Sequence, residues 1–319
     1  MSRGTISQRE GVLIRAEAPD GKTAFSEAVI LPYFGTETLE QSVKYVKGLN
    51  SQFNQQTIQS IPDEMFATRF ALESAKWLLA SEVTDGISQN KLAVSYLLRP
   101  EKNAAVADLL SAQKNGYSTF KCKIGLHPFL EEKKLVQLLL SHLSIGSSLR
   151  LDANGGLNFK TAQEWLKLAE HSAIEFIEQP LEPTQRDELM KLTEVSSTRI
   201  ALDETVATSN ELIELSELGW KGIFVVKPSR LGNLEKFLNW RSQSLREIVY
   251  SSALETSVGT ELGLKLASLD LNNSRAIGYG VGQWFIEDSL YIHPESPTLK
   301  AGLITNTQLQ QIFASCSQL

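Results

Sequence analysis

From about Leu92 onward, short apolar runs alternate with helix-like segments, and this alternation limits the folds that are open to the chain. The strand-like runs begin near Leu92, Thr119, Leu149, Ile174, Ile200, Gly222 and Ile248, with a shorter one near Ala276. The helix-like segments between them are Asn103 to Lys114, Phe129 to Leu143, Ala162 to Glu170, Thr184 to Glu194, Ser209 to Glu217 and Asn233 to Ser242. Strands that alternate with helices at this spacing indicate βα units and a parallel sheet. Seven or eight units in succession favour a closed barrel over a doubly wound sheet, so we predict an α/β fold with a modified (β/α)7–8 TIM-like barrel.

The N-terminal part of the chain shows a different order of predicted strands and helices. Glu10 to Glu17 and Ala24 to Leu31 read as two strands of a hairpin, with a turn signal at Asp20-Gly21 between them. Thr38 to Leu49 and Asp63 to Ser81 have helical spacing. We therefore predict an N-terminal α+β domain over residues 1–90, completed by about 284–319, and a barrel over residues 91–283 that carries the active site.

The composition is that of an ordinary globular protein, with 319 residues, 42% hydrophobic residues and a net charge of -6. An acidic chain is a poor nucleic-acid binder, because phosphate binding needs a basic face. The opening residues lack the apolar core of a signal peptide, and no apolar run is long enough to span a bilayer. We expect a cytoplasmic protein without nucleic-acid or membrane partners, whose cysteines, Cys122 and Cys316, are reduced.

Charged side chains stand at the ends of successive strand-like runs. These residues are Lys121, Lys123, Asp152, Glu178, Asp203 and Lys227. Side chains alternate along a strand, so both lysines of the first run point to one face. At the C-terminal ends of barrel strands all six side chains would meet at the mouth, where βα barrels hold their active sites.

Three of these residues, Asp152, Glu178 and Asp203, are carboxylates that follow apolar residues and have no cationic sequence neighbour. A lone aspartate at such a place is more often a helix cap or part of a loop ion pair, but three that converge in a buried site call for a cation. Hard oxygen ligands favour Mg²⁺, with Mn²⁺ as a possible substitute.

The lysines predict acid–base chemistry beside that cation. A lysine that acts as a base near neutral pH needs a pKa about three units below its usual value of about 10.4, and a second ammonium group nearby lowers it. We therefore interpret Lys123 as the base and Lys121 as the neighbour that tunes it, although a Lys-x-Lys pair alone is more typical of a solvated strand edge. A metal that holds a carboxylate next to a lysine is suited to removing the proton α to that carboxylate.

The motifs that carry this chemistry resemble those of the muconate-lactonizing-enzyme group of the enolase superfamily. They are Lys121-x-Lys123, Asp152-x-Asn154-Gly155, Glu178-Gln-Pro180, Asp203-Glu204 and Lys227-Pro228. Within this group the chain is most similar to the o-succinylbenzoate synthase family of menaquinone biosynthesis. The segments that carry this closer resemblance are Arg9–Gly11, Ser26–Ala28 with Leu31-Pro32, Arg69–Glu73 and Ser251–Gly259.

The resemblance implies a role for each matching residue. It makes the N-terminal domain a capping domain, and it makes Asp152, Glu178 and Asp203 ligands of Mg²⁺. Lys123 would carry the proton and Lys227 would stabilise the enediolate as a cation. The residues on the substrate side, or behind the ligands, would be Arg150, Asn154, Ser251, Ser252, Ser257, Tyr33 and Phe34, with the three serines as candidates for the succinyl carboxylate. The reaction would be Mg²⁺-dependent dehydration of a small carboxylate, 2-succinyl-6-hydroxy-2,4-cyclohexadiene-1-carboxylate, to 2-succinylbenzoate.

Two other functions stay open at this point. A racemase of N-succinylamino acids, or an epimerase of dipeptides, would use the same metal with Lys123 and Lys227 as opposed bases. Against the epimerase, Ile277–Gly282 lacks the paired aspartates that would hold a substrate ammonium group. A catalytically inactive barrel used as a binding module is disfavoured by the intact lysines and carboxylates. The sequence leaves the oligomeric state undetermined.

Overall fold

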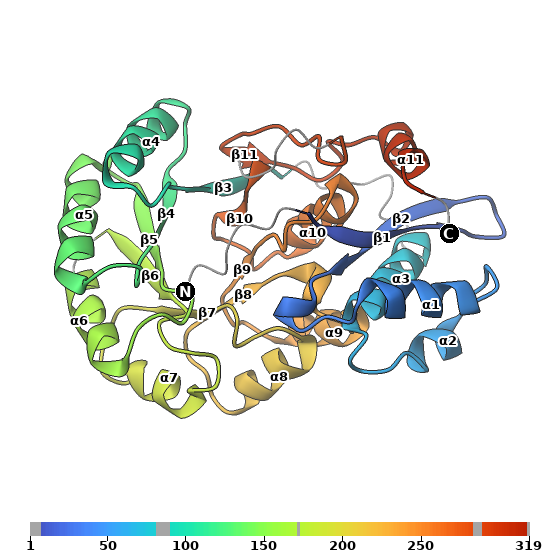
Figure 1. Cartoon of the computed structure of the whole chain (residues 1–319), viewed down its shortest axis with the longest axis horizontal. Coiled ribbons are helices and arrows are strands. Elements are labelled where there is room, and N and C mark those ends of the chain that lie inside the picture. The colour runs from blue at the N-terminus through green and yellow to red at the C-terminus, as the bar shows by residue number, and fades with distance from the viewer. Residues whose placement is uncertain (1–7, 81–89, 171–172, 283–288, 318–319) are drawn as a thin grey trace.

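The computed structural model describes residues 8–80, 90–170, 173–282 and 289–317. Eight parallel strands form its central sheet, in the spatial order β10-β3-β4-β5-β6-β7-β8-β9. Their bounds are β3 (Leu92–Leu97), β4 (Thr119–Lys123), β5 (Ser148–Asp152), β6 (Ile174–Glu178), β7 (Ile200–Leu202), β8 (Ile223–Val226), β9 (Ile248–Tyr250) and β10 (Ile277–Gly280). The sheet closes on itself through a parallel bridge between Ser251 and Gly278, so the predicted barrel is confirmed (Figure 1).

Helices surround the barrel, as the alternation predicts (Figure 1). They are α4 (Lys102–Lys114), α5 (Phe129–His142), α6 (Phe159–Ala169), α7 (Arg186–Leu192), α8 (Ser209–Glu217), α9 (Leu234–Gln243) and α10 (Ser257–Leu269). The interior of the barrel holds a small apolar cluster of Phe176, Ala201, Ile223, Val225 and Val249. The larger core lies between strands and helices and includes the fully buried Trp165 and Trp220. Burial on both faces explains why the strands read as continuous apolar runs.

The seam of the barrel depends on a glycine. A Cβ atom added at Gly278 would lie 2.5 Å from Oγ of Ser251, which is closer than real Cβ contacts allow. With glycine at this position β9 and β10 lie close together, and the backbone N–H of Ser252 donates to the carbonyl of Gly278 at 3.1 Å. Gly278 thus leaves room for the contact that closes the ring.

The N-terminal unit packs beside the barrel. It contains the antiparallel hairpin of β1 (Glu10–Glu17) and β2 (Thr23–Ile30), the 3-10 turn η1 (Pro32–Phe34), and helices α1 (Leu39–Gly48), α2 (Gln55–Gln59) and α3 (Phe66–Ala80). The hairpin and both predicted helices are confirmed, except that Ser81 lies outside the described residues, and α2 was not predicted. Small residues of α3, Ala67 and Ala71, let this helix lie close against β2 at Ala28.

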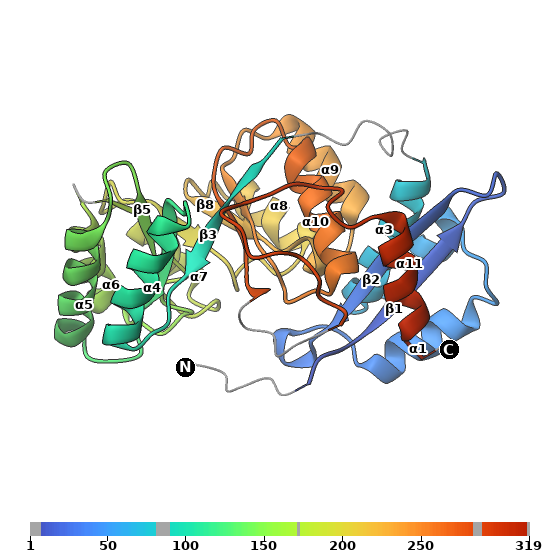
Figure 2. The ribbon, with the colours of Figure 1, turned by 90° about the horizontal axis from the view of Figure 1, so that it is seen from above.

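The C-terminal segment returns to both parts of the molecule. Strand β11 (Thr298–Leu299) pairs antiparallel with β3, and α11 (Asn306–Ser315) packs beside the hairpin (Figure 2). The rings of Phe313 and Phe25 lie 6.1 Å apart at this contact. We call the N-terminal unit together with α11 the capping unit; that the returning segment completes an N-terminal domain stays a prediction. The domain boundary predicted at 283/284 lies outside the described residues, and the division at residue 90 stays a prediction.

Among the described residues, no helix is both long and apolar enough to cross a membrane.

Candidate active site

The charged residues predicted for the mouth stand at one end of the barrel. Lys123, Asp152 and Glu178 are the last residues of β4, β5 and β6, and they are lateral neighbours in the register of these strands. Asp203 and Lys227 directly follow β7 and β8. Because the strands are parallel, the five side chains share the C-terminal face of the barrel.

Lys121 lies between two of the carboxylates. Its Nζ atom is 2.9 Å from Oδ2 of Asp152 and 2.6 Å from Oε1 of Glu178. Burial alone would lower the pKa of Lys121, but these two carboxylates and Asp203 outweigh it and raise the pKa above its ordinary value. Lys121 is therefore a permanent cation in this arrangement, and its predicted effect on Lys123 stays a prediction.

One ammonium group cannot neutralise two buried carboxylates. Burial, with repulsion from Asp152 and Asp203, raises the pKa of Glu178 to about 8 even though Lys121 acts in the opposite direction. The lysines separate the acidic groups, and among the described residues no three Asp, Glu, His or Cys side chains form a ready-made metal cluster. The buried carboxylates nevertheless carry more negative charge than the lysine neutralises. A divalent cation that prefers oxygen ligands would balance this charge.

Asp203 has its own cation on the opposite side of the mouth. Nζ of Lys227 lies 2.5 Å from its carboxylate. Burial would raise the pKa of Asp203, but Lys227 and Lys121 lower it. The neighbouring Glu204 has a raised pKa, caused by burial and by Asp203, and its Oε2 atom is buried without a hydrogen-bond partner. The mouth therefore holds four acidic groups in close succession.

Asn154 connects Lys123 to this acidic side. The ammonium group of Lys123 donates to Oδ1 of Asn154 at 2.7 Å, and Nδ2 of Asn154 donates to Oε1 of Glu204 at 3.1 Å. The backbone of Asn154 is left-handed, with φ of 42°, and its N–H donates to Oδ1 of Asp152 at 3.0 Å. Asparagine tolerates this conformation better than most residues. A polar side chain thus holds the end of Lys123 in place.

The closed strand order puts the two lysines on opposite sides of the mouth. In the ring of eight strands, β4 and β8 are four places apart in either direction, with β5, β6 and β7 between them on one side. Lys123 and Lys227 therefore face each other across the mouth, and the three carboxylates occupy one of the arcs between them. A small carboxylic acid bound there would meet one lysine on each side.

The turn η1 of the capping unit reaches this end of the barrel. Tyr33 and Phe34 line a hollow of about 380 Å³ together with Glu204 and Arg230. Nη2 of Arg230 donates to the carbonyl of Phe34 at 2.9 Å, and its guanidinium lies over the Phe34 ring. Sequence reasoning missed Arg230, although its place three residues after Lys227 was a possible signal. A substrate contact by either aromatic residue stays a prediction.

The structure corrects the prediction for Arg150. Its guanidinium points into the barrel but is only 2% exposed, and it pairs with Glu175 at 2.7 Å. It also donates to the carbonyl of Ala276 at 2.8 Å and lies over the ring of Phe176. Arg150 lies two residues before Asp152 on the strand, so it occupies a deeper layer of the interior and does not face the substrate side.

The three candidate serines differ in their surroundings. Ser257 is fully buried, its Oγ accepts from the backbone N–H of Ile292 at 2.8 Å and it is bonded to Nδ1 of His293 at 3.0 Å, so its predicted contact with the succinyl group is wrong. Ser252 is also buried and donates to Glu255 at 2.5 Å. Ser251 is partly exposed, unlike the other two, and its hydroxyl donates to the carbonyl of Gly278 at 3.3 Å.

Comparisons with known proteins agree on one fold and one group of enzymes. The model of the family "Enolase C-terminal domain-like" matches residues 104–269. The chain is 29% identical over 296 residues to o-succinylbenzoate synthase of Thermosynechococcus vestitus, which covers 89% of this chain and 88% of that one. It is 26% identical to o-succinylbenzoate synthase of Aliivibrio salmonicida, over 84% of this chain and 82% of the other.

Solved structures give the same result. The crystal structure of o-succinylbenzoate synthase from Thermosynechococcus elongatus BP-1, complexed with Mg in the active site, has a TM-score of 0.82 at 28% identity and covers 97% of this chain and 92% of that one. The N-succinyl Arg/Lys racemase of Bacillus cereus has a TM-score of 0.80 at 20% identity, with 98% and 92% covered. At 20% identity, the similarity to the racemase shows a shared fold and no more.

Proposed function

This chain belongs to the enolase C-terminal domain-like family, and on that premise we propose that it is an o-succinylbenzoate synthase. It would dehydrate 2-succinyl-6-hydroxy-2,4-cyclohexadiene-1-carboxylate to 2-succinylbenzoate, in menaquinone biosynthesis. The observation that carries the proposal is the placement of Lys123 and Lys227 on opposite sides of a mouth that also holds three buried carboxylates. The similarity to o-succinylbenzoate synthases along nearly the whole chain supports this choice within the family.

We propose that Asp152, Glu178 and Asp203 hold Mg²⁺. All three offer carboxylate oxygen, the ligand type that Mg²⁺ prefers, and the raised pKa of Glu178 reflects an acidic group that lacks sufficient positive charge. The relative with Mg in its active site supports the same ion, and Mn²⁺ is a candidate substitute. When bound, the ion would supply a Lewis acid that stabilises negative charge on the substrate carboxylate.

Lys123 would move the proton. As a neutral amine it removes the proton on the carbon next to the substrate carboxylate, and the electron pair moves into an enediolate. As an ammonium it then returns a proton to the departing hydroxyl group, so that water leaves and the ring becomes aromatic. The bond from Lys123 to Asn154 at 2.7 Å would keep the amine on the side where both transfers occur.

Lys227 would act as a fixed positive charge on the other side. Its pairing with Asp203 at 2.5 Å keeps it at the mouth. Such a group stabilises the enediolate without exchanging a proton.

A direct assay tests the proposal. Purified protein with Mg²⁺ should form 2-succinylbenzoate from the cyclohexadiene carboxylate, and exhaustive chelation should stop turnover until Mg²⁺ is returned. A protein that turns over fully after chelation contradicts the metal assignment, and one that never forms the product contradicts the function.

N-succinylamino acid racemase is the second candidate, because opposed lysines are what a two-base racemisation needs. The same assay with a pure enantiomer of an N-succinylamino acid distinguishes the two. Exchange of the α-hydrogen with solvent deuterium and loss of optical activity would assign racemisation to the same site.

A further inference from the structure

A carboxylate of the capping unit is buried against a barrel helix. Glu27 of β2 is 1% exposed. It accepts hydrogen bonds from the backbone N–H of Thr256 at 2.9 Å, from the hydroxyl of Thr256 at 2.6 Å and from the backbone N–H of Gly259 at 3.1 Å. Arg9 donates to its other oxygen at 2.6 Å. Glu27 therefore caps the first turn of α10 from another part of the chain.

The turn that precedes α10 is built around a second buried carboxylate, Glu255. This side chain accepts from the hydroxyl of Ser252 at 2.5 Å, from the backbone N–H of Ala253 at 3.0 Å and from the hydroxyl of Ser229 at 2.9 Å. Within the turn, Leu254 has a left-handed backbone with φ of 67°, a strained conformation for a bulky residue. The hydrogen bonds to Glu255 keep the backbone of the turn in this strained conformation.

This turn borders the mouth beside Lys227. The backbone N–H of Ser251 donates to the carbonyl of Val226 at 2.9 Å, so Ser251 is the lateral neighbour of Lys227 in the barrel. Ser229, which donates to Glu255, comes two residues after Lys227. Residues 251–256, hereafter the β9–α10 turn, thus adjoin one of the two lysines.

Glu27 and Glu255 both pack against Gly259. A Cβ atom added at Gly259 would lie 2.8 Å from Oε2 of Glu27 and 2.8 Å from the side chain of Glu255. The carboxylate of Glu27, from the capping unit, and the Cβ and Cγ atoms of Glu255, from the turn itself, lie against this one glycine. A displacement of the capping hairpin must therefore pull on Thr256 and on the turn.

We propose that Glu27 is a positioning residue through which the capping unit holds the β9–α10 turn in its substrate-binding conformation. The inference rests on the proposed function, because it assumes that the substrate lies at the mouth beside Ser251. In the described part of the chain, no hydrogen bond or ion pair joins Glu27 to the lysines or carboxylates of the mouth, and its contacts with α10 run through Thr256 and Gly259. Its removal should weaken binding of the succinyl end of the substrate more than it slows proton transfer at Lys123.

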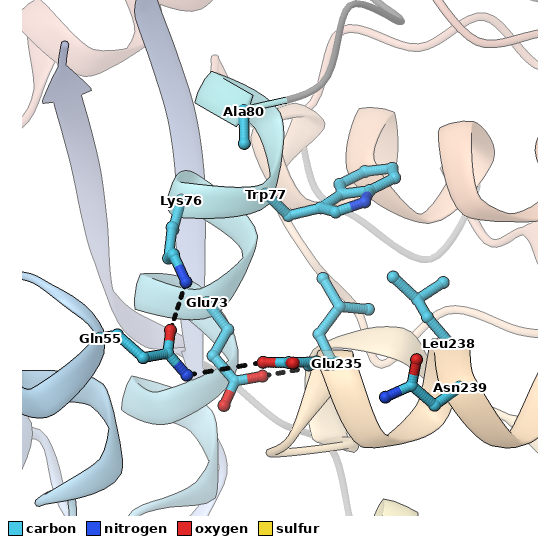
Figure 3. A pocket seen from close by; sticks show the side chains of 9 residues that line it. Gln55, Glu73, Lys76, Trp77, Ala80, Glu235, Leu238 and Asn239 are labelled. Carbon is cyan, nitrogen blue, oxygen red and sulfur yellow. Dashed lines mark hydrogen bonds between the residues drawn. The ribbon is translucent and has the colours of Figure 1, made fainter.

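The same domain contact supplies a matched control. Figure 3 shows Glu73 of α3 beside the first turn of α9, where it accepts from the backbone N–H of Glu235 at 3.2 Å. Glu73 thus also caps a barrel helix from the capping unit, but its hollow is lined by residues such as Trp77 and Leu238 and not by the β9–α10 turn. Loss of Glu73 loosens the contact between the units without touching that turn.

The test compares Glu27→Gln with Glu73→Gln in the full-length protein. For Glu27→Gln we expect KM for the cyclohexadiene carboxylate to rise about tenfold while kcat stays within about threefold of wild type. The dissociation constant of the product, measured by calorimetry, should rise by a similar factor. Glu73→Gln should leave both constants unchanged, and Glu27→Asp, which keeps the charge, should recover part of the loss.

Gly259→Ala tests the contact from the other side. The added methyl group would lie 2.8 Å from both the Glu27 carboxylate and the Glu255 side chain, so it disturbs both groups that hold the turn, and KM should again rise with little change in kcat. Equal effects of Glu27→Gln and Glu73→Gln on KM would overturn the inference, and so would a fall in kcat alone. An inactive wild-type protein would instead refute the proposed function. If Glu27→Gln does not fold, Thr256→Val carries the same comparison; it removes the hydroxyl bond to Glu27, together with the bond that this hydroxyl accepts from the backbone N–H of Val258.

Discussion

The ammonium group of Lys123 donates a 2.7 Å hydrogen bond to Oδ1 of Asn154, whose own amide nitrogen donates to Glu204. Lysine is only a donor and an ionised glutamate only an acceptor, so the amide between them has a single favourable orientation. Asn154 therefore fixes the direction from which Lys123 approaches the mouth.

Asn154→Ala should lower kcat about tenfold or more with little change in KM, because Lys123 loses the group that orients it. Steady-state kinetics measures the effect. Alanine tolerates the left-handed backbone of residue 154 less well than asparagine, so Asn154→Ala should also lose some stability. Asn50→Ala measures this backbone cost alone, since Asn50 has φ of 48° on an exposed turn. Wild-type kcat in Asn154→Ala would contradict the orienting role.

Lys227→Arg should keep measurable dehydratase activity but no racemisation. A guanidinium still places a positive charge beside Asp203, whereas it cannot accept and return a proton near neutral pH. Parallel assays with the cyclohexadiene carboxylate and an N-succinylamino acid measure both activities. Racemisation that survives in Lys227→Arg would exclude Lys227 as a second base.

Ser257→Ala should reduce stability without changing KM. The substitution leaves the backbone N–H of Ile292 and the ring of His293 without their common partner, at a cost of about 1–3 kcal/mol. Ser251→Ala is the counterpart, because Ser251 is partly exposed beside Lys227 and its loss should raise KM instead. Denaturant unfolding and kinetics on both variants test the pair, and the reverse pattern would restore Ser257 to the substrate site.

The ion pairs inside the barrel predict a pH effect on stability. Burial would raise the pKa of Glu175, but Arg150 and Arg275 lower it below its ordinary value. A carboxylate whose pKa is lower in the folded state adds stability above its unfolded pKa of about 4.3, and this contribution disappears as the pH falls through the folded value. Glu175→Gln should therefore cost about 3 kcal/mol at neutral pH, since it leaves the buried guanidinium of Arg150 without its carboxylate partner, whereas Arg275 keeps Glu247. The difference from wild type, measured by unfolding in denaturant, should shrink below about pH 4; a difference independent of pH would contradict the ion-pair origin.

The barrel could be predicted because its strands are buried on both faces and stay apolar up to a charged last residue. Alternation along β5 puts Arg150 on the same inward face as Asp152, as its position over the Phe176 ring shows. It could not say how deep a side chain lies, and two residues along a strand correspond to about 6.6 Å, enough to move Arg150 from the mouth to the interior. Helix α10 was not predicted, since the helix-like segments recognised in the sequence end at Ser242.

The contacts made by Glu27 had no signal in the sequence pattern. Glu27 and Thr256 are 229 positions apart, and no periodicity connects a hairpin carboxylate with the N-terminus of a distant helix. The same holds for His293, which is buried between Ser257 and Glu261. Such contacts depend on how the capping unit and the C-terminal segment fold back onto the barrel.

The most direct test is conversion of the cyclohexadiene carboxylate by wild type and by Lys123→Ala with Mg²⁺ present. Wild type should form 2-succinylbenzoate, and Lys123→Ala should be slower by at least about a hundredfold, the range for loss of a general acid–base group, with unchanged circular dichroism. Lys114→Ala, which removes an exposed lysine at the end of α4, should match wild type. Turnover by Lys123→Ala within a few-fold of wild type would contradict Lys123 as the proton carrier.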